Sequence, residues 1–523
     1  MYLVHNLPIK MYRERLKSNN HNYNMDYSKE FDDLQTYLKN DELARAKTLL
    51  DQNTNFTKYH ADGIIHLLSK ELTETNYIEK RKLFNFCEVH LHSMAENIDL
   101  QENVFDFIEL IDLRDCKLSS TVSIAITVLN TMENPNLVCL EYLLSSTFNH
   151  LNEMDSIRLE NNLLHVISML TKLEKHINNQ LSALFYFVKM SYLFLRTNID
   201  PITFLDTTRN LLSDPFYLLE YEFEQTEERI LENKCMASFF YLYLKNGILW
   251  NPKVYSRFYI LEKLSNLAMS VFEDDRFGKS FTKLILTKYK ENEIPLHSLN
   301  KHHEEFFMEA AHTSLYNLTL DVRKDSFESL MLFIDKLCSE AQYIVFRRVF
   351  TKLIDSGLKA ELVIKMKQLL FSKIKNQEDS QYFKGKRLLE MVQLCCNIPY
   401  GPECDVINNK EHVLAAITLA YVLYGYNGDG LCMDKPFLNY LDVFVSVVQN
   451  AIDYSAVQYK LESIKLNNPG NCKEDTISVQ VQNENLPIPS LNEKRKMLSQ
   501  YNTTIKLIQS NLDLLKGIIK CRN

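Results

Sequence analysis

Hydrophobic residues recur every three or four positions through most of this chain. In residues 76–94, for example, Ile78, Leu83, Cys87 and Leu91 fall on one stripe. The same pattern repeats over residues 156–177, 227–246, 252–272, 326–353 and 361–374. This spacing is typical of an α-helix with one buried face. The pattern therefore predicts a long series of amphipathic helices.

Short joints separate the predicted helices. Asn134-Pro135-Asn136, Asp200-Pro201 and Asn251-Pro252 can each end one helix and begin the next, because a first helical turn tolerates proline. Helices joined by only a few residues must lie antiparallel. Nearly every predicted helix keeps a charged face, which argues against one large bundle with fully buried helices. The sequence predicts an all-α solenoid of irregular helical pairs, HEAT- or armadillo-like, with about 40–47 residues per pair.

The last quarter of the chain departs from this pattern. A long helix is predicted over residues 436–466 and a terminal helix over 492–521. Between them, Ile477–Val481 alternates with a period of two, which predicts a small β-hairpin. We expect this part to cap the solenoid with a polar outer face. The predicted divisions are a flexible lead-in at 1–27, an N-terminal helical-repeat region at 28–320 and a partner-binding C-terminal helical-repeat region at 321–523.

Composition supports a helical protein and narrows its partners. The chain has only 11 glycines and 12 prolines in 523 residues, well below the usual ~7% and ~5%. Its net charge of -8 gives no drive toward a phosphate backbone, so nucleic acid is not an expected partner. No stretch approaches ~20 uninterrupted apolar residues, and the N-terminus lacks the apolar core of a signal peptide, so no membrane association is expected. We expect the protein to be located in the cytoplasm, with the nucleus as a second compartment.

Candidate catalytic and metal-binding residues are few. The chain contains no glycine-rich phosphate loop, no Gly-x-Ser-x-Gly and no His-Glu-x-x-His. Glu309 and His312, with Glu305 on the same helical face, have the spacing of a di-iron helix, but the second motif set of such a site is missing. The cysteines between residues 395 and 432 lack the paired short spacings of a zinc site. A solvent-facing helix and buried thiols explain these residues, so we expect no enzyme, no cofactor and no metal.

One segment concentrates the glycines and prolines that the rest of the chain lacks. It reads Tyr382-Phe-Lys-Gly385 at the start of a predicted helix and Ile398-Pro-Tyr-Gly-Pro-Glu-Cys-Asp405 after it. The next helix begins Asn409-Lys-Glu-His-Val-Leu-Ala-Ala, and the terminal helix carries Leu507-Ile-Gln-Ser-Asn-Leu512. In their order and spacing, these segments, which span about residues 347–516, resemble the glomulin family of HEAT-like inhibitors of cullin–RING ubiquitin ligases.

The resemblance implies a steric mechanism. A protein of this kind would bind the RING subunit of a cullin–RING ligase with its C-terminal repeats. It would thereby block docking of the ubiquitin-conjugating enzyme and inhibit ubiquitination without catalysis. The resemblance also implies an immunophilin and a receptor tyrosine kinase as further partners. A general α-solenoid adaptor or scaffold, of transport or phosphatase type, is the alternative.

Seven residues of the C-terminal region are candidate partner contacts. Interfaces concentrate their binding energy in aromatic and arginine side chains, and several of these residues belong to predicted helix starts and loops. They are Tyr382, Arg387, Tyr400, His412, Tyr421, Tyr424 and Tyr501. In the competing interpretation, several of the tyrosines only pack one repeat against the next.

Overall fold

The computed structural model describes residues 28–97, 103–113, 115–178, 180–212, 214–220, 229–247, 255–272, 277–375, 381–425, 435–467, 480–481, 484–485 and 490–522. The predicted lead-in at 1–27 lies outside the described residues. The chain divides into two compact units, Met1–Phe277 and Gly278–Asn523, which are described separately below. The functional division expected near residue 320 stays a prediction.

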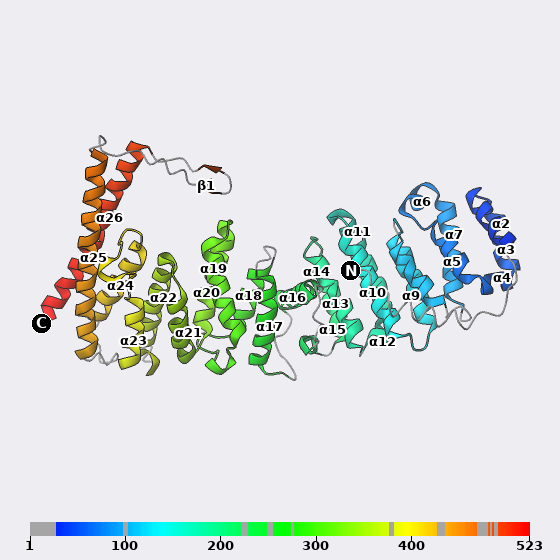
Figure 1. The fold of residues 1–523 in the computed structure, drawn as a ribbon. Helices are drawn as coiled ribbons and strands as arrows, with labels where there is room; N and C mark the ends of the chain where they lie inside the picture. Colours follow the sequence, from blue (N-terminus) through cyan, green and yellow to red (C-terminus); the bar gives the residue numbers. More distant parts are fainter. Residues whose placement is uncertain are drawn as a thin grey trace. The chain divides into compact units, whose positions relative to one another are not determined.

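The N-terminal unit is built from short and medium helices (Figure 1). Its α-helices are α2 (Ser28–Lys39), α3 (Leu43–Gln52), α4 (Thr54–Tyr59), α5 (Ala61–Ser69), α6 (Glu74–Glu79), α7 (Arg81–Ala95), α8 (Val104–Ile108), α9 (Leu118–Thr131), α10 (Leu137–Glu153), α11 (Ser156–Leu170), α12 (Glu174–Ile177), α13 (Leu181–Lys189), α14 (Ser191–Phe194), α15 (Ile202–Leu211), α16 (Arg229–Lys245) and α17 (Arg257–Val271). Its 3-10 helices are η2 (Glu109–Asp112), η3 (Thr171–Leu173) and η4 (Pro215–Glu220).

The C-terminal unit contains the longest helices. Its α-helices are α18 (Gly278–Leu286), α19 (Lys301–Tyr316), α20 (Leu320–Lys336), α21 (Ser339–Lys352), α22 (Ser356–Lys375), α23 (Gly385–Cys395), α24 (Lys410–Gly425), α25 (Lys435–Asn467) and α26 (Leu491–Arg522). Its other elements are the 3-10 helices η5 (Leu296–Ser298), η6 (Gln381–Phe383) and η7 (Gly401–Glu403) and the strands β1 (Gln480–Val481) and β2 (Glu484–Asn485).

The helix α11 illustrates how a cap and an apolar stripe produce a helix of this chain. The side chain of Asp155 accepts a hydrogen bond from the backbone N–H of Arg158, which satisfies a donor that the first turn leaves open. Leu159, Leu163 and Leu170 are fully buried along one face. In the N-terminal unit, α5, α7, α9 and α11 pack side by side as one layer, and α8, α10, α13 and α16 form the other.

The C-terminal unit has the same two-layer arrangement (Figure 1). One layer, called the even-numbered layer here, contains α18, α20, α22, α24 and α26. The other, the odd-numbered layer, contains α19, α21, α23 and α25. Short joints make consecutive helices antiparallel, so helices within one layer run parallel to each other.

Successive helical pairs contact each other at a nearly constant separation along the chain. Lys117 Nζ donates to Glu74 at a separation of 43 residues, and Ser191 Oγ donates to the carbonyl of Cys235 at 44. In the C-terminal unit, Arg348 donates to Glu304, also at 44 residues. These separations fall within the predicted repeat length of about 40–47 residues. The prediction of an all-α solenoid of irregular helical pairs is confirmed.

Several predicted elements differ from the structure. The stretch 76–94 is divided between α6 and α7 at Lys80, and Ile78, expected on the buried stripe, is 77% exposed. The stretch 156–177 is divided into α11, η3 and α12. The single helix predicted over 326–353 is divided between α20 and α21, because the backbone N–H of Cys338 donates to the carbonyl of Ile294, in a loop of the preceding pair. The long helix predicted at 436–466 is confirmed as α25. The β-hairpin is not supported as a structural element, since the described pairing joins only Gln480–Val481 with Glu484–Asn485.

No helix that the structure describes combines the length and the apolar composition that crossing a bilayer demands.

Candidate partner-binding site

A groove of about 760 Å³ lies on the C-terminal unit, between helices of the even-numbered layer. Its walls come from the N-terminal halves of α20, α22 and α24 and from the end of α19. Apolar side chains of Leu320, Phe327, Ile364 and Leu414 contribute to the lining. Leu320 is 69% exposed although it is aliphatic. An accessible apolar groove of this kind is typical of a binding site.

Three cations border this groove, and none has a partner of opposite charge in the described part of the chain. Arg323, Lys324 and Lys367 line it and form no ion pair with any residue that the structure describes. The Nε atom of Arg323 is buried and has no hydrogen-bond partner. Two carboxylates, Glu361 and Glu411, also line the groove, and Glu411 is already paired with Lys410 at 3.4 Å. The unpaired cations favour a partner that carries negative charge next to apolar groups.

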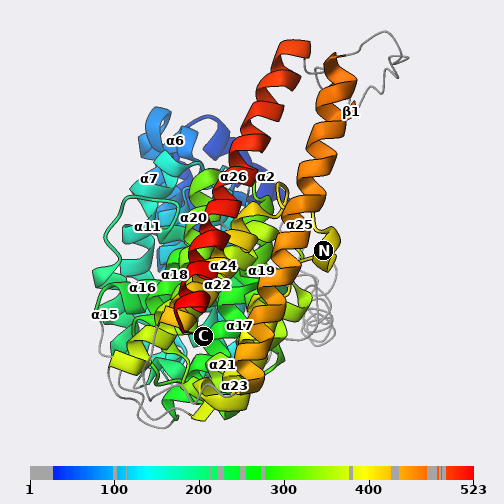
Figure 2. The same cartoon turned by 90° about the vertical axis from the view of Figure 1, so that its left-hand side faces the viewer.

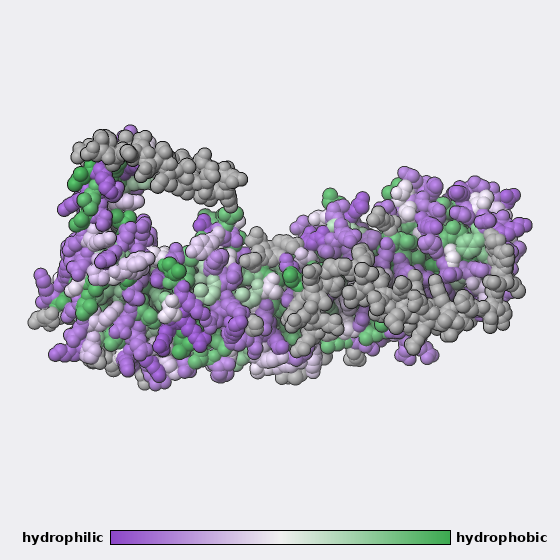
Figure 3. All heavy atoms as spheres, viewed as in Figure 1, coloured by the Kyte–Doolittle hydropathy of each residue, from purple (hydrophilic) through white to green (hydrophobic). Residues whose placement is uncertain are grey.

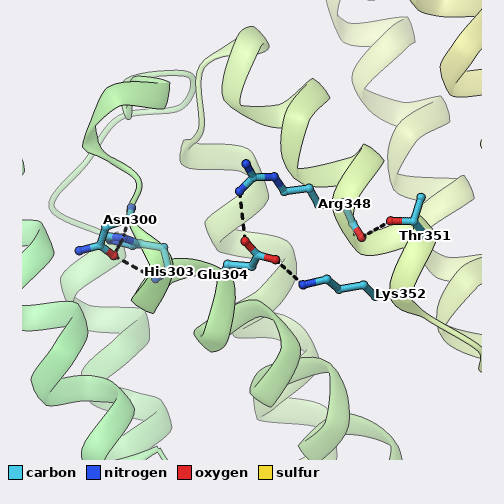
Figure 4. Close-up of polar contacts among 6 residues, drawn as sticks. All are labelled: Asn300, His303, Glu304, Arg348, Thr351 and Lys352. Carbon is cyan, nitrogen blue, oxygen red and sulfur yellow. Dashed lines mark hydrogen bonds and ion pairs between the residues drawn. The ribbon is translucent and has the colours of Figure 1, made fainter.

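Neighbouring cations of the odd-numbered layer are, by contrast, neutralised within the chain (Figure 4). Glu304 on α19 accepts from Arg348 at 3.1 Å and also from Lys352, both on α21. The Lys352 hydrogen bond and the two positive charges lower the pKa of Glu304. These contacts join successive repeats, so the cations of α21 serve the solenoid itself.

Tyr421 lies on the groove side of α24. Glu411, Leu414 and Thr418 line the groove, and Tyr421 follows them at the spacing of one helical face. Its side chain is 39% exposed. Tyr421 therefore lies on the same face of α24 as the residues that line the groove, and its contact with a partner stays a prediction.

Two other candidates are buried. His412 is 0% exposed, and its Nε2 lies 2.8 Å from the carbonyl oxygen of Cys395. Burial lowers the pKa of His412, and the nearby charge of Lys359 acts in the same direction. Tyr424 is 5% exposed and donates to Asp442 on α25 at 2.9 Å. Both residues hold neighbouring helices together, and their expected contact with a partner stays a prediction.

The glycine- and proline-rich corner is mainly a structural joint. Ser455 of α25 is buried, and its Oγ accepts from the N–H of Val406 and donates to the carbonyl of Cys404, both at 3.1 Å. At the exposed tip, Tyr400 and Gly401 have φ of 60° and 55° in the left-handed region, where glycine carries no steric cost. Tyr400 is 85% exposed there. The Tyr400 side chain is therefore accessible at this tip, and Pro402, Glu403 and Asp405 of the corner are exposed as well.

Tyr382 and Arg387 lie together in the odd-numbered layer. The guanidinium of Arg387 stands 4.3 Å from the centre of the Tyr382 ring, and that ring lies 6.0 Å from Tyr343 of α21. Both side chains are half-buried. The structure brings this pair together but places it on a different layer from Tyr421.

Tyr501 lies in the N-terminal half of α26 and is 38% exposed. It precedes Ile508 and Leu515 on the same helical face, and these two residues are fully buried where α26 packs against its neighbours. Tyr501 thus lies on the face of α26 that packs against the neighbouring helices, but at a position where this face is partly exposed. The seven candidates do not form one cluster.

The candidate metal ligands have other partners. Glu305 pairs with Lys301 at 3.0 Å, Glu309 accepts from the hydroxyl of Thr313 at 3.4 Å, and the His312 ring lies 4.8 Å from Tyr316. Within the described part of the chain, no group of three or more His, Cys, Asp or Glu side chains could hold a metal ion.

The clustered cysteines behave as core residues where the structure describes them. Cys395, Cys396 and Cys404 are buried, and burial raises the pKa of the Cys404 thiol to about 11. Their thiols stay protonated at neutral pH, which disfavours metal ligation and nucleophilic chemistry. Cys432 lies outside the described residues.

The groove residues were not found by sequence reasoning. Leu320, Ile364 and Leu414 follow the same helical spacing as residues of the core, so the pattern marks them only as apolar positions. The one usable signal in the sequence was the presence of lysine or arginine close to such apolar positions at the start of a helix, as in Leu320, Arg323 and Lys324.

Stacked helical repeats with an accessible apolar groove define a helical-repeat protein of the protein-interaction class. Comparison with known proteins narrows this class further. The chain is similar to human glomulin, with 25% identity over 319 residues, and to mouse glomulin, with 26% identity over 325 residues. The alignments cover 58% of this chain and 52% and 53% of the two relatives, so the chain spans about half the length of the proteins it matches.

The similarity to glomulin supports the resemblance drawn from the C-terminal motifs. The aligned share, 58% of the chain, is larger than the last third, in which those motifs lie. No family model matches the chain.

Proposed function

We propose that this protein is a non-catalytic regulator that binds the RING subunit of a cullin–RING ubiquitin ligase. Binding blocks the docking of the ubiquitin-conjugating enzyme and so inhibits ubiquitination. The observation that carries the proposal is the similarity to human and mouse glomulin. We assign the function to the cytoplasm, with the nucleus as a second compartment.

The C-terminal unit offers a suitable surface for this steric role. Its groove combines an apolar lining with the unpaired cations Arg323, Lys324 and Lys367, and Tyr421 lies on the same face of α24 as its lining residues. A specific interface of standard size buries about 1,600 Å² and needs no catalytic group. The zinc ions of such a complex belong to the RING subunit, and inhibition requires only that the enzyme's docking surface is covered.

Calorimetric titration of the full chain into a purified cullin–RING core tests the proposal. We expect the double variant R323E/K367E to raise the dissociation constant at least tenfold, because it places negative charge beside the groove. The matched control is K82E, which reverses an exposed charge on α7 in the N-terminal unit. A wild-type chain that does not bind the core contradicts the proposed function. Equal affinities of wild type, R323E/K367E and K82E place the contact outside the groove.

The immunophilin and the receptor tyrosine kinase implied by the resemblance stay predictions. Neither has an assigned surface on this chain.

A further inference from the structure

The long helix α25 carries a second apolar stripe, called the outer seam here. Its members alternate between spacings of four and three residues, the repeat of a coiled coil. They are Val443, Val447, Asn450, Tyr454, Val457, Leu461 and Ile464. Five of these side chains are exposed: Val443 by 59%, Tyr454 by 42%, Val457 by 54%, Leu461 by 48% and Ile464 by 58%.

The outer seam faces away from the rest of the unit. On the opposite face of α25, Leu441, Val448 and Ser455 are buried against the solenoid. Gln449 exchanges hydrogen bonds of 3.1 Å with Gln509, which marks the side that faces α26. Among Val457 to Leu466, no residue is buried. The terminal helical pair was expected to present a polar outer face, but the outer side of α25 carries an exposed apolar stripe.

The ends of α25 and α26 extend beyond the other helices of the C-terminal unit (Figure 2). Hydrophobic residues are visible along these projecting ends (Figure 3). The outer seam runs for about 32 Å, at 1.5 Å per residue. That length is sufficient for pairing with another helix, and exposed apolar stripes of this kind mark interaction surfaces.

We propose that the outer seam pairs with the outer seam of a second copy of this chain, with the two α25 helices antiparallel. In this register, Val447 lies opposite Ile464 of the second copy, Asn450 opposite Leu461, and Tyr454 opposite Val457. Each of these layers occurs twice because the arrangement has twofold symmetry.

Charge complementarity favours the second copy and the antiparallel direction. Asp453 and Lys460 flank the seam on one side, and neither forms an ion pair with any described residue. Asp453 accepts only a hydrogen bond from Gln449 of its own helix, at 3.1 Å. Antiparallel pairing brings Asp453 of each copy beside Lys460 of the other, which gives two symmetric ion pairs. A parallel arrangement would instead bring Lys460 near Lys465 of the second copy, where like charges repel.

The inference does not depend on the proposed function, because the outer seam and the groove are separate surfaces. Sedimentation velocity of the full chain tests it, since the dimer has twice the 61.4 kDa mass of one chain. We expect the wild type to dimerise and V457D/L461D to be monomeric. We expect K460D to raise the dimer dissociation constant at least tenfold, and D453K/K460D to restore dimerisation by exchanging the two charges. The control V89D alters an exposed valine of α7 and should dimerise as wild type does.

Three results would overturn the pairing. One is a wild type that stays monomeric at 100 µM, and this result overturns the pairing even if α25 binds another protein or a lipid surface. Another is a dimer that persists unchanged in V457D/L461D with a native circular dichroism spectrum. The third is a D453K/K460D variant that is as weakly associated as K460D, which would exclude the antiparallel register.

Discussion

Ser455→Ala tests whether the corner between α23 and α24 is a structural joint. The Ser455 hydroxyl connects α25 to both sides of the corner, through the N–H of Val406 and the carbonyl of Cys404. Ser455 is 4% exposed, so water does not easily replace the lost hydroxyl. A buried group left without its partner costs about 1–3 kcal/mol. With one donor and one acceptor affected, we expect a loss of about 2–4 kcal/mol in the free energy of unfolding of this unit.

The assay is thermal unfolding followed by circular dichroism, with hydrogen exchange at the Val406 amide. For a unit of this size, each kcal/mol lowers the melting temperature by about 2–4 °C, so Ser455→Ala should lower it by about 4–16 °C. The amide of Val406 should also lose protection, because its acceptor is removed.

Ser446→Ala is the matched control for this change. Ser446 is an exposed serine of the same helix, and its hydroxyl donates only to Asp442 within α25, at 3.3 Å. Substitutions of this kind usually change stability by less than about 0.5 kcal/mol. Equal melting temperatures for the two variants, together with a protected Val406 amide in Ser455→Ala, would refute the structural role of the corner.

Three further predictions concern residues that the sequence singled out. Tyr424→Phe should lower the melting temperature by removing the hydrogen bond to Asp442. Tyr421→Ala should leave the melting temperature unchanged and weaken binding of the cullin–RING core. A lower melting temperature in Tyr421→Ala and weaker binding alone in Tyr424→Phe would contradict the positions of the two side chains. The pKa of His412 is lowered in the folded state, so the unfolded chain binds a proton first and the stability of the fold should decrease as the pH drops below about 6.5. His412→Gln should therefore lose less stability than the wild type between pH 7.5 and 5.5. Identical losses in the two proteins would exclude His412 as the source of the pH dependence. Iodoacetamide at pH 8 should label the exposed Cys521 before Cys395 or Cys396 of the native chain, as read by mass spectrometry, and rapid labelling of the latter pair would contradict their burial.

Helix content and repeat type were predictable because they depend on local periodicity. The pattern of α25 extends almost from end to end as predicted, from Lys435 to Asn467. The break between α20 and α21 was not predictable, because no glycine or proline marks it and the contact with Ile294 comes from another repeat. Periodicity locates an apolar stripe, and long-range contacts decide where a helix is interrupted.

The candidate site was less predictable than the fold for a related reason. His412 and Leu414 are two residues apart on α24, yet one is buried against Cys395 and the other lines the groove. Only the neighbouring helices determine which side of α24 is covered. The outer seam of α25 was missed because the same helix carries a buried seam, and the two apolar sets together hide the heptad spacing.

The most direct test of the central claim is competition at the RING subunit. A cullin–RING core is mixed with a fluorescent ubiquitin-conjugating enzyme, and anisotropy is followed while the full chain is added. We predict that the enzyme is displaced completely at saturation and that ubiquitin-chain synthesis stops over the same concentration range. A chain that binds the core while the enzyme remains bound and active would contradict the steric mechanism.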